Sequence, residues 1–429
     1  MEAGIGEGHG AVKGARIAIV GSGPAGCYAA ERLAKLVPDG EVDVLDRLPA
    51  PFGLIRYGVA PDHQGTKGVA RVLSRVLSRP PAAFFGNVEL GRDVGLDELR
   101  ALYDAVVLAV GAPLDRRLGV PGEDLPGVSG SGAFVGWYNG HPDHCAAAPD
   151  LSAVRRAVVV GNGNVALDVA RVLAKSDEEL KGSDLSPEAA AAIAAAPLEE
   201  VVIVGRRGAA EARFSPTELE ELGRLARARP TVRPDDLPAE DGGHALLPIF
   251  RRFAGEGGEE PMRIRFRFGL TPDAFLPGPD GRLGAVRFRT AAGGEEQIPA
   301  QLCVTCIGYR HGGLQDLPTH DGAFRNEAGR IADRLYVVGW AKRGPSGTIP
   351  TNRSEAHAVA EKLVSELQPS ARPGREGLRR LLAERGVRAV DFAGWQRLEA
   401  HETAAAVEGR VRAKVTSLAE MLEIVGRTS

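Results

Sequence analysis

Cysteine is scarce in this chain: four of its 429 residues are cysteines, and only 5% are aromatic. Four scattered cysteines are too few for the disulfide framework of a secreted protein. No apolar run approaches the roughly 18 to 20 residues that a membrane-spanning helix requires. We therefore expect a soluble, globular protein whose core is held by apolar packing and not by cross-links.

A strong excess of charge of either sign is also absent. Lys and Arg number 53 and Asp and Glu number 56, a formal net charge of -3, so no global basic field favours nucleic acid or anionic lipid. The start of the chain is rich in glycine, and it lacks the apolar core of a signal peptide and the Arg-rich amphipathicity of a transit peptide. We expect residues 1–15 to form a disordered tail and the protein to be cytoplasmic.

Short β-branched apolar runs alternate with helix-like segments, which is typical of parallel sheets covered by helices. The length fits two domains of typical size or three small ones, and we take two as the working number. The pattern predicts an α/β protein with two Rossmann-like, doubly wound dinucleotide-binding domains. The strand candidates are residues 16–20, 41–45, 105–110, 157–160, 201–204, 302–307 and 335–338.

Other segments extend this plan. Residues 262–268 and 286–290 alternate apolar and polar side chains, which predicts half-exposed strands in an antiparallel addition to the second domain. The Ala-rich segment 176–197 predicts a helical insertion. After Pro373 the chain becomes rich in Arg and Glu and is predicted to be helical, with Trp395 as a packing anchor.

A glycine-rich turn, Gly21-Ser22-Gly23-Pro24-Ala25-Gly26, follows the first strand candidate and opens a helix-like segment. In a GxGxxG turn, the first glycine permits the tight turn, the second admits a pyrophosphate and the third lets helix and strand pack closely. Asp46 ends the next strand, at the spacing of about 20 residues that suits a carboxylate on the ribose hydroxyls. Residues 51–63 are rich in Gly, Pro and aromatics, as in a ligand-lining loop, so we assign this site to FAD rather than NAD.

The same kind of turn recurs after residues 157–160 as Gly161-Asn162-Gly163-Asn164-Val165-Ala166. At the end of the following strand, Arg206 and Arg207 stand where an NAD site would carry an acidic residue. Two guanidinium groups suit a dianionic 2′-phosphate, which they bind through charge-assisted bidentate hydrogen bonds. The second site is therefore predicted to bind NADP(H); the alternative is a solvated arginine pair.

With two such turns in this order, the sequence resembles the adrenodoxin reductase-like ferredoxin-NADP reductase family, which has a bacterial branch, over nearly its whole length. In the wider disulfide-reductase class an aspartate usually stands at the position of Trp340, so this residue favours the narrower family. The motifs that carry the resemblance are residues 51–63, 111–112, 134–139, 161–168, 204–208, Phe214 with Glu218 and Leu219, and 338–348.

The resemblance implies a set of cofactor contacts and a domain plan. The FAD domain would comprise residues 16–112 and 330–429, the latter with C-terminal helices, and the NADP domain would be inserted as residues 113–329. The implied FAD contacts are Ala25, Asp46, Leu54, Val88, Trp340, Gly347, Thr348 and Ile349. The implied NADP(H) contacts are Asn162, Gly163, Asn164, Val165, Arg206, Arg207, Glu218 and Gly347.

In this family NADPH delivers hydride to the flavin N5, and electrons then pass singly to a separate iron-sulfur protein, a ferredoxin. The sequence has no recognisable catalytic triad or metal-ligand cluster, which agrees with chemistry carried by the cofactor. His63 and Glu221 resemble the family's charged pair near the flavin and nicotinamide. The alternatives are a loop histidine satisfied by backbone groups, and solvated carboxylates for Glu218 and Glu221.

Two further patterns lie outside the nucleotide sites. Cys303 and Cys306 form a CxxC pattern, but they lie in an apolar strand, where residues three apart point to opposite faces, so we expect buried, inert thiols. Arg251 and Arg252, with Arg263, Arg265 and Arg267, form the densest basic region outside the nucleotide sites. A ferredoxin could dock there by electrostatic steering; a solvated basic face is the alternative.

These observations favour an FAD-dependent NADPH:ferredoxin oxidoreductase. One alternative is the flavoprotein subunit of a larger amidotransferase-type synthase, although its N-terminal cysteine-rich cluster domain has no counterpart here. Another is a redox sensor that binds FAD and NADPH but turns over negligibly. The sequence does not determine which ferredoxin is the partner, the direction of electron flow or the oligomeric state.

Overall fold

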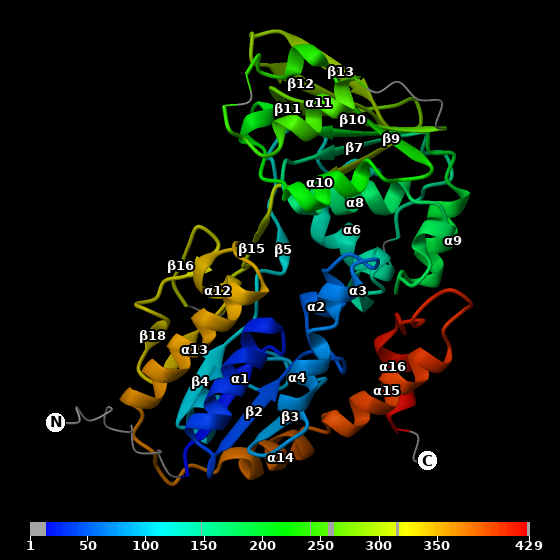
Figure 1. Cartoon of the computed structure of the whole chain (residues 1–429). Helices are drawn as coiled ribbons and strands as arrows, with labels where there is room; N and C mark the ends of the chain where they lie inside the picture. The colour runs from blue at the N-terminus through cyan, green and yellow to red at the C-terminus, as the bar shows by residue number, and fades with distance from the viewer. Residues whose placement is uncertain (1–13, 147, 241, 256–260, 315–316, 427–429) are drawn as a thin grey trace, which may run out of the picture.

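The computed structural model describes residues 14–146, 148–240, 242–255, 261–314 and 317–426. Most of the expected tail, residues 1–13, lies outside these ranges. The described residues form two lobes, each built on a six-stranded sheet (Figure 1). The lobe at the bottom of Figure 1 contains the first glycine turn and is called the first lobe; the upper one is the second lobe.

The first-lobe sheet has the strand order β18-β19-β4-β1-β2-β3. The strands from β19 to β3 run parallel, and only the edge strand β18 pairs antiparallel with its neighbour. This order, with helices on both faces, is that of a doubly wound nucleotide-binding sheet. The strands are β1 (Arg16–Val20), β2 (Glu41–Leu45), β3 (Ala82–Phe85), β4 (Ala105–Leu108), β18 (Arg330–Ala332) and β19 (Leu335–Val337).

The second-lobe sheet has the order β6-β14-β7-β8-β10-β9 and is parallel throughout. Helices cover one face, and an antiparallel sheet, β11-β12-β13, covers the other. Its strands are β6 (Val128–Gly130), β7 (Arg156–Val160), β8 (Glu200–Val204), β9 (Ala228–Val232), β10 (Met262–Arg267) and β14 (Leu302–Thr305). The covering strands are β11 (Leu270–Pro277), β12 (Leu283–Thr290) and β13 (Glu295–Pro299).

Helices complete both lobes. In the first lobe α1 packs against α13 on one face of the sheet, and α5 packs against α14 on the other. The first-lobe helices are α1 (Pro24–Leu36), α2 (Leu54–Tyr57), α3 (Gln64–Lys67), α4 (Ala70–Leu77), α5 (Leu96–Leu102), α12 (Trp340–Arg343), α13 (Ile349–Glu366), α14 (Gly374–Glu384), α15 (Phe392–Ala404) and α16 (Leu418–Gly426). Those of the second lobe are α6 (Ser131–Tyr138), α7 (Pro142–Cys145), α8 (Asn164–Ala174), α9 (Pro187–Ala195), α10 (Pro216–Leu222) and α11 (Leu247–Gly255).

One strand assignment from the sequence was wrong. Met262–Arg267 is the parallel strand β10, between β8 and β9, and not part of the antiparallel addition, which contains β12 as expected. Its alternating arginines do not all face water: Arg267 is buried and pairs with Glu296 of the covering sheet. A strand face that forms ion pairs with a covering sheet therefore gives the same alternation of apolar and polar residues as a face exposed to solvent.

The chain passes between the lobes along an antiparallel ribbon of β5 (Leu114–Asp115) and β15 (Tyr309–Arg310). Figure 1 shows this ribbon between the two sheets. The short hairpin β16 (Thr319–His320) and β17 (Ala323–Phe324) follows it, and Phe324 packs in a first-lobe core cluster. The exact boundaries at residues 112/113 and 329/330 stay a prediction.

The C-terminal part is helical, as expected, from α14 to α16. Trp395 on α15 is 1% exposed, and its ring makes an edge-to-face contact with Phe52 at 6.1 Å between centroids. This packing brings α15 against the loop that precedes α2. The expected helix within residues 176–197 is α9, which Ser186 caps by accepting a hydrogen bond from Ala189 N.

Candidate functional site

The first glycine turn has the geometry of a phosphate-binding site. Gly21 has a φ of 109°, and a Cβ there would lie 2.4 Å from the carbonyl oxygen of Ala109; one on Gly26 would lie 1.9 Å from that of Gly21. Gly23 is the N-cap residue of α1, and since it has no side chain, it leaves the first N–H groups of the helix uncapped. A Cβ on Gly23 would meet nothing within 4 Å. Open space thus lies in front of unsatisfied backbone N–H groups, which fits a pyrophosphate.

Asp46 lies directly beside this turn, at the end of β2. Its Oδ2 accepts hydrogen bonds from Ser22 N at 2.9 Å and Ser22 Oγ at 2.5 Å, and its Oδ1 accepts one from Leu48 N at 3.0 Å. Val88 N donates to the backbone oxygen of Asp46 at 2.8 Å. The structure therefore brings Asp46 and Val88 to the same edge of the sheet, while their contacts with the cofactor stay a prediction.

Two segments that are distant in the sequence lie against the start of α1. A Cβ on Gly53 would lie 3.0 Å from Gly23 Cα, and one on Gly339 would lie 2.6 Å from the Cβ of Ala25. Leu54 follows Gly53 and is 44% exposed, so it presents an apolar surface beside the turn. Trp340 follows Gly339 and begins α12, so these predicted FAD residues gather around one turn.

The remaining predicted contacts after Trp340 lie at the start of α13. Thr348 is the N-cap residue of this helix and forms a capping box with Thr351, and Ile349 is the first helical residue. Gly347 has a φ of 84°, a backbone conformation that favours glycine. Because α13 packs along α1, this helix start lies at the same end of the first lobe as the glycine turn.

The second glycine turn repeats this geometry. Gly163 caps α8 without a side-chain hydrogen bond, and a Cβ on it would meet nothing within 4 Å. Asn162 Oδ1 is buried without a hydrogen-bond partner among the described residues, and Asn164 Oδ1 accepts from Ser215 N at 2.8 Å. Val165 packs against the second-lobe core. The unsatisfied donors and acceptor suit a polar ligand.

Arg206 and Arg207 follow β8 and are both exposed. Arg207 Nε lies 3.8 Å from Glu211 Oε1, and the described part of the chain gives Arg206 no ion-pair partner. Both guanidinium groups are thus open to an anion. The backbone of Arg213, a third exposed arginine that the sequence did not single out, donates to Asn162 O at 2.8 Å and so lies beside the same turn.

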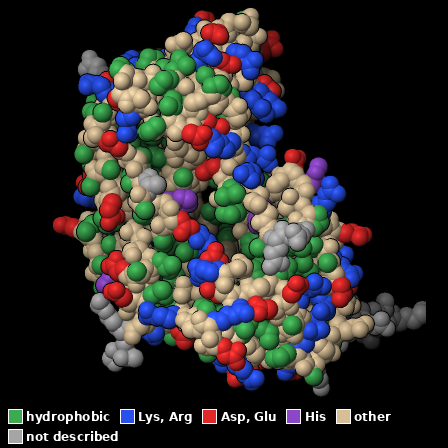
Figure 2. Space-filling view, turned by 180° about the vertical axis from the view of Figure 1, so that it is seen from behind, with side chains coloured by type: hydrophobic (Ala, Val, Ile, Leu, Met, Phe, Trp, Pro, Cys, Tyr) green, Lys and Arg blue, Asp and Glu red, His purple; other side chains and the backbone are tan. Residues whose placement is uncertain are grey.

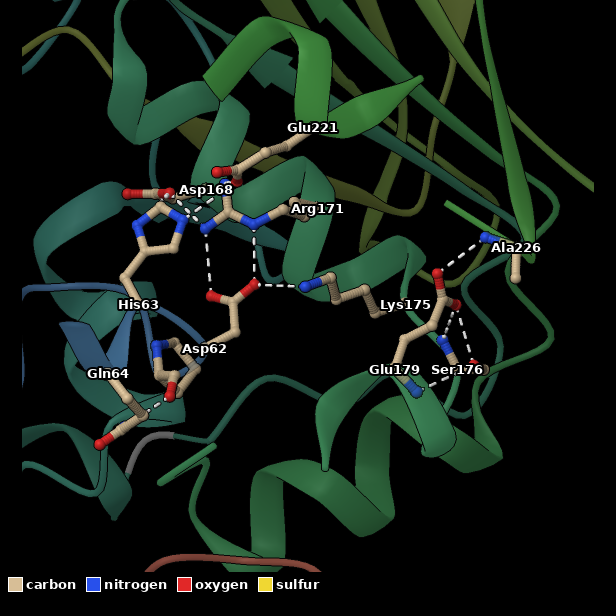
Figure 3. Close-up of polar contacts among 11 residues, drawn as sticks. Asp62, His63, Gln64, Asp168, Arg171, Lys175, Ser176, Glu179, Glu221 and Ala226 are labelled. Atoms are coloured by element: carbon tan, nitrogen blue, oxygen red, sulfur yellow. Dashed lines mark hydrogen bonds and ion pairs between the residues drawn. The ribbon is translucent and has the colours of Figure 1, made fainter. Parts of the chain in front are cut away.

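The two lobes meet at His63, which precedes α3 (Figure 3). His63 Nε2 lies 3.2 Å from Glu221 Oε2 on α10, and Nδ1 lies 3.9 Å from Asp168 Oδ1 on α8. Burial, followed by the negative charge of Asp168, raises the pKa of Glu218 to about 6. The structure therefore brings the predicted pair together, next to further carboxyl groups of the second lobe.

Arg171 connects these carboxylates to the first lobe. Its fully buried side chain (0% exposed) donates to both oxygens of Asp62, at 2.8 and 3.1 Å, and to Asp168 at 2.7 Å. Lys175 Nζ lies 2.7 Å from the Asp62 carboxylate. Burial alone would raise the pKa of Asp62, but Arg171 and Lys175 hold it well below its usual value. Asp62 therefore stays ionised and bridges the lobes.

No sequence pattern identifies Asp62, Asp168, Arg171 or Tyr309 as site residues. The first two lie inside quoted motifs, and Arg171 stands three residues after Asp168 on the same helix, a spacing that could have indicated the pair. Tyr309, on the ribbon between the lobes, stacks on Trp340 with 5.6 Å between ring centroids. Only the folded arrangement of the ribbon against α12 reveals this contact.

The predicted docking region is only partly a basic surface. Arg251 donates to Pro238 O and Ala239 O, and Arg252 pairs with Glu220 at 3.1 Å. Arg267 is buried in ion pairs, which corrects its assignment to this surface, and Arg265 pairs with Glu200. Arg252 and Arg263 remain exposed.

Cys303 and Cys306 are both free thiols. Cys303 is buried in the core cluster on one side of the second-lobe sheet, and Cys306 packs against the cluster on the other side. Burial raises the pKa of the Cys303 thiol. Cys303 is buried as expected, whereas Cys306 is only partly buried, and the two thiols are not joined. That they have no redox role stays a prediction.

Within the described ranges, no group of three or more His, Cys, Asp or Glu side chains is arranged to hold a metal ion. No helix there is long and apolar enough to cross a bilayer.

Between the lobes the surface is hollowed, and charged side chains of both signs line this hollow (Figure 2).

Comparison with known proteins identifies the family of this chain. A family model described as pyridine nucleotide-disulphide oxidoreductase matches residues 15–222. Human mitochondrial NADPH:adrenodoxin oxidoreductase is 39% identical, covering 96% of this chain and 92% of the relative. The NADPH-ferredoxin reductase FprA of Mycobacterium tuberculosis is 40% identical, covering 95% and 98%.

A solved structure of M. tuberculosis FprA in complex with NADPH matches with a TM-score of 0.91 and 37% identity, covering 96% of this chain and 99% of that one. This agreement extends over both lobes. The chain therefore belongs to the family of NADPH:adrenodoxin oxidoreductases and NADPH-ferredoxin reductases.

Proposed function

We propose that the protein is an FAD-dependent NADPH:ferredoxin oxidoreductase. One observation carries this proposal: two phosphate-binding turns lie in separate lobes, and His63 of the first lobe lies 3.2 Å from Glu221 of the second, where the lobes meet. When bound, FAD accepts hydride from NADPH and passes electrons on singly, so the protein need only bind and orient the partners.

Each element has a defined part in this proposal. The start of α1 holds the FAD pyrophosphate, with Asp46 on the ribose, and the start of α8 holds that of NADPH. Arg206 and Arg207 bind the 2′-phosphate, and the His63–Glu221 pair lies at the meeting point of the two cofactors. The division into an FAD domain (16–112 and 330–429) and an NADP domain (113–329), and a cytoplasmic location, belong to the same proposal.

The test is reduction of the flavin under anaerobic conditions. The purified protein should be yellow, lose its visible flavin absorption rapidly with NADPH and slowly with NADH, and regain it when an oxidised ferredoxin is added. A protein that does not take up FAD, or a flavin that neither nucleotide reduces, would overturn the proposal. Reduction without measurable steady-state turnover on any acceptor would instead support a redox sensor.

Alanine at the two open glycines should separate the cofactor sites. Gly23 and Gly163 have φ angles of -66° and -119°, which alanine adopts, and a Cβ meets no protein atom at either. We expect Gly23→Ala to fold but to lose FAD on desalting, because its methyl group occupies the space for the pyrophosphate. We expect Gly163→Ala to keep FAD and to raise the KM for NADPH about tenfold, which corresponds to about 1.4 kcal/mol of binding free energy.

Flavin content after desalting and steady-state kinetics with an artificial acceptor measure both effects. The matched control is Gly255→Ala, at the end of α11, where a Cβ also meets nothing within 4 Å. Full FAD retention by Gly23→Ala would argue against a pyrophosphate at this turn.

For the partner, we propose that an acidic ferredoxin docks on the exposed arginines near α11. Arg252 is 55% exposed and would exchange Glu220 for a carboxylate of the partner. We expect Arg252→Glu to raise the KM for ferredoxin about fivefold at low salt and little at high salt, because exposed charges are screened beyond about 10 Å at 0.1 M salt. Turnover with a small neutral acceptor should not change, and Arg379→Glu on α14 serves as the control. A salt-independent KM would contradict this docking site.

A further inference from the structure

The segment between α15 and α16, residues 405–417, crosses from the first lobe to the second and is called the C-terminal strap. Gly182 N donates to Gly409 O at 2.6 Å, and Val411 N donates to Ser183 O at 3.1 Å. In Figure 1 this red segment rises from the first-lobe helices toward the second lobe. The strap thus links the two lobes, although it lies far from both glycine turns in the sequence.

The strap inserts Lys414 into a buried polar cluster. The Lys414 side chain is fully buried, and its Nζ lies 2.8 Å from Asp184 Oδ2, 3.2 Å from Asp184 O and 3.4 Å from Asn139 Oδ1. An ammonium group has three N–H donors, so each has an acceptor here. Lys414 is therefore held in one position.

Lys67 completes the cluster from the first lobe. Its Nζ lies 2.7 Å from Asp184 Oδ1, 2.8 Å from Asn139 Oδ1 and 3.2 Å from Arg56 O. Asp184 thus bridges two lysines, and Asn139 accepts from both. Burial lowers the pKa of both lysines, while Asp184 opposes this shift. Loss of one partner would leave buried groups uncompensated, which is strongly unfavourable.

The cluster fixes the backbone of residues 54–63, which comprise α2 and the turn that ends at His63 and are called the loop below. Three carbonyl groups of this loop are held: Arg56 O by Lys67, Val59 O by Asn139 Nδ2 at 3.1 Å, and Pro61 O by Asp184 N at 3.1 Å. A second connection from the same C-terminal region is the buried ion pair of Arg56 with Glu402, at 2.5 Å. The strap therefore supports the loop through contacts that are separate from the ion pair of Arg171 with Asp62.

We propose that Lys414 is a positioning residue for hydride transfer, acting through Asp184, Asn139 and Lys67 to hold the loop that places Leu54 and His63. The inference rests on the proposed function, because the loop matters only if nucleotide reduces flavin there. Misplacement by about 1 Å can cost on the order of 100-fold in rate, and such a loss lowers the rate of the step more than it weakens binding.

The experiment compares single-turnover flavin reduction at saturating NADPH in wild-type protein, Lys414→Met and Arg410→Met. Arg410 lies on the same strap and pairs with Asp177 of the second lobe, so its replacement removes the same charge from the strap. We expect Lys414→Met to retain FAD, to reduce it at least about tenfold more slowly, and to change the dissociation constant of NADPH less than about threefold. Arg410→Met should keep the wild-type rate.

Reduction by Lys414→Met within twofold of the wild-type rate would overturn the inference, as would an equal loss in Arg410→Met. Should Lys414→Met fail to retain FAD, Lys414→Gln keeps two N–H donors and is measured in the same way. A slower flavin reduction in that variant supports the positioning role, and a wild-type rate refutes it. Failure of the wild-type flavin to accept electrons from NADPH would refute the proposed function itself, so the two failures are distinguishable.

Discussion

Replacement of Arg206 and Arg207 by glutamine is expected to lower kcat/KM for NADPH by about ten- to a hundredfold and to leave that for NADH nearly unchanged. Both guanidinium groups are exposed at the end of β8. Arg207 Nε lies 3.8 Å from Glu211 Oε1, and Arg206 has no ion-pair partner among the described residues. A charge-assisted hydrogen bond contributes about 1.5 to 3 kcal/mol, which sets this range. NADH lacks the 2′-phosphate, so it loses no such contact.

Steady-state kinetics with both nucleotides and an artificial acceptor measure this change in preference. The matched control is Arg379→Gln/Arg380→Gln, an adjacent exposed pair on α14 of the first lobe, which removes the same charge. Equal losses with NADPH and NADH would show that the two arginines support the fold of the second lobe and do not select the cofactor.

Arg171→Met is expected to have the largest effect on stability. Arg171 is the buried partner of Asp62 and Asp168, and removal of one member of a buried ion pair typically costs about 3 to 5 kcal/mol of unfolding free energy. Arg155→Met provides the contrast, because Arg155 and Glu199 form a largely exposed pair that should contribute less than about 1 kcal/mol. Urea unfolding of the FAD-loaded proteins measures the difference.

The effect of Arg171→Met should also depend on pH. The folded-state pKa of Asp62 lies below its ordinary value, so its stabilising contribution is present above that ordinary value, about 3.9, and is lost as the pH falls through the folded-state value. The difference between wild type and Arg171→Met should therefore be full at pH 7 and shrink in acid. A difference that is the same at pH 7 and at a pH well below 3.9 would mean that lost packing, and not the charge of Asp62, causes the destabilisation.

The sequence was sufficient wherever the signal is local. Strand, glycine turn and helix follow one another within a few residues at both sites, and the required close approaches of Gly21 and Gly26 are present in the structure. The family resemblance added His63 and Glu221, which lie 158 residues apart and still meet. The strand at Met262–Arg267 was misassigned because an arginine that forms a buried ion pair gives the same alternation of apolar and polar residues as one that faces water.

The sequence alone thus determined the two dinucleotide turns, the likeness to this reductase family and the choice of NADP(H) as second cofactor to be tested. Only the tertiary structure decided that Asp62 lies against Arg171, that Arg252 is paired with Glu220 and that Lys414 supports the loop before His63. The physical reason is that these contacts join residues far apart in the chain. Their partners depend on how the lobes and the strap pack, and no local periodicity encodes that packing.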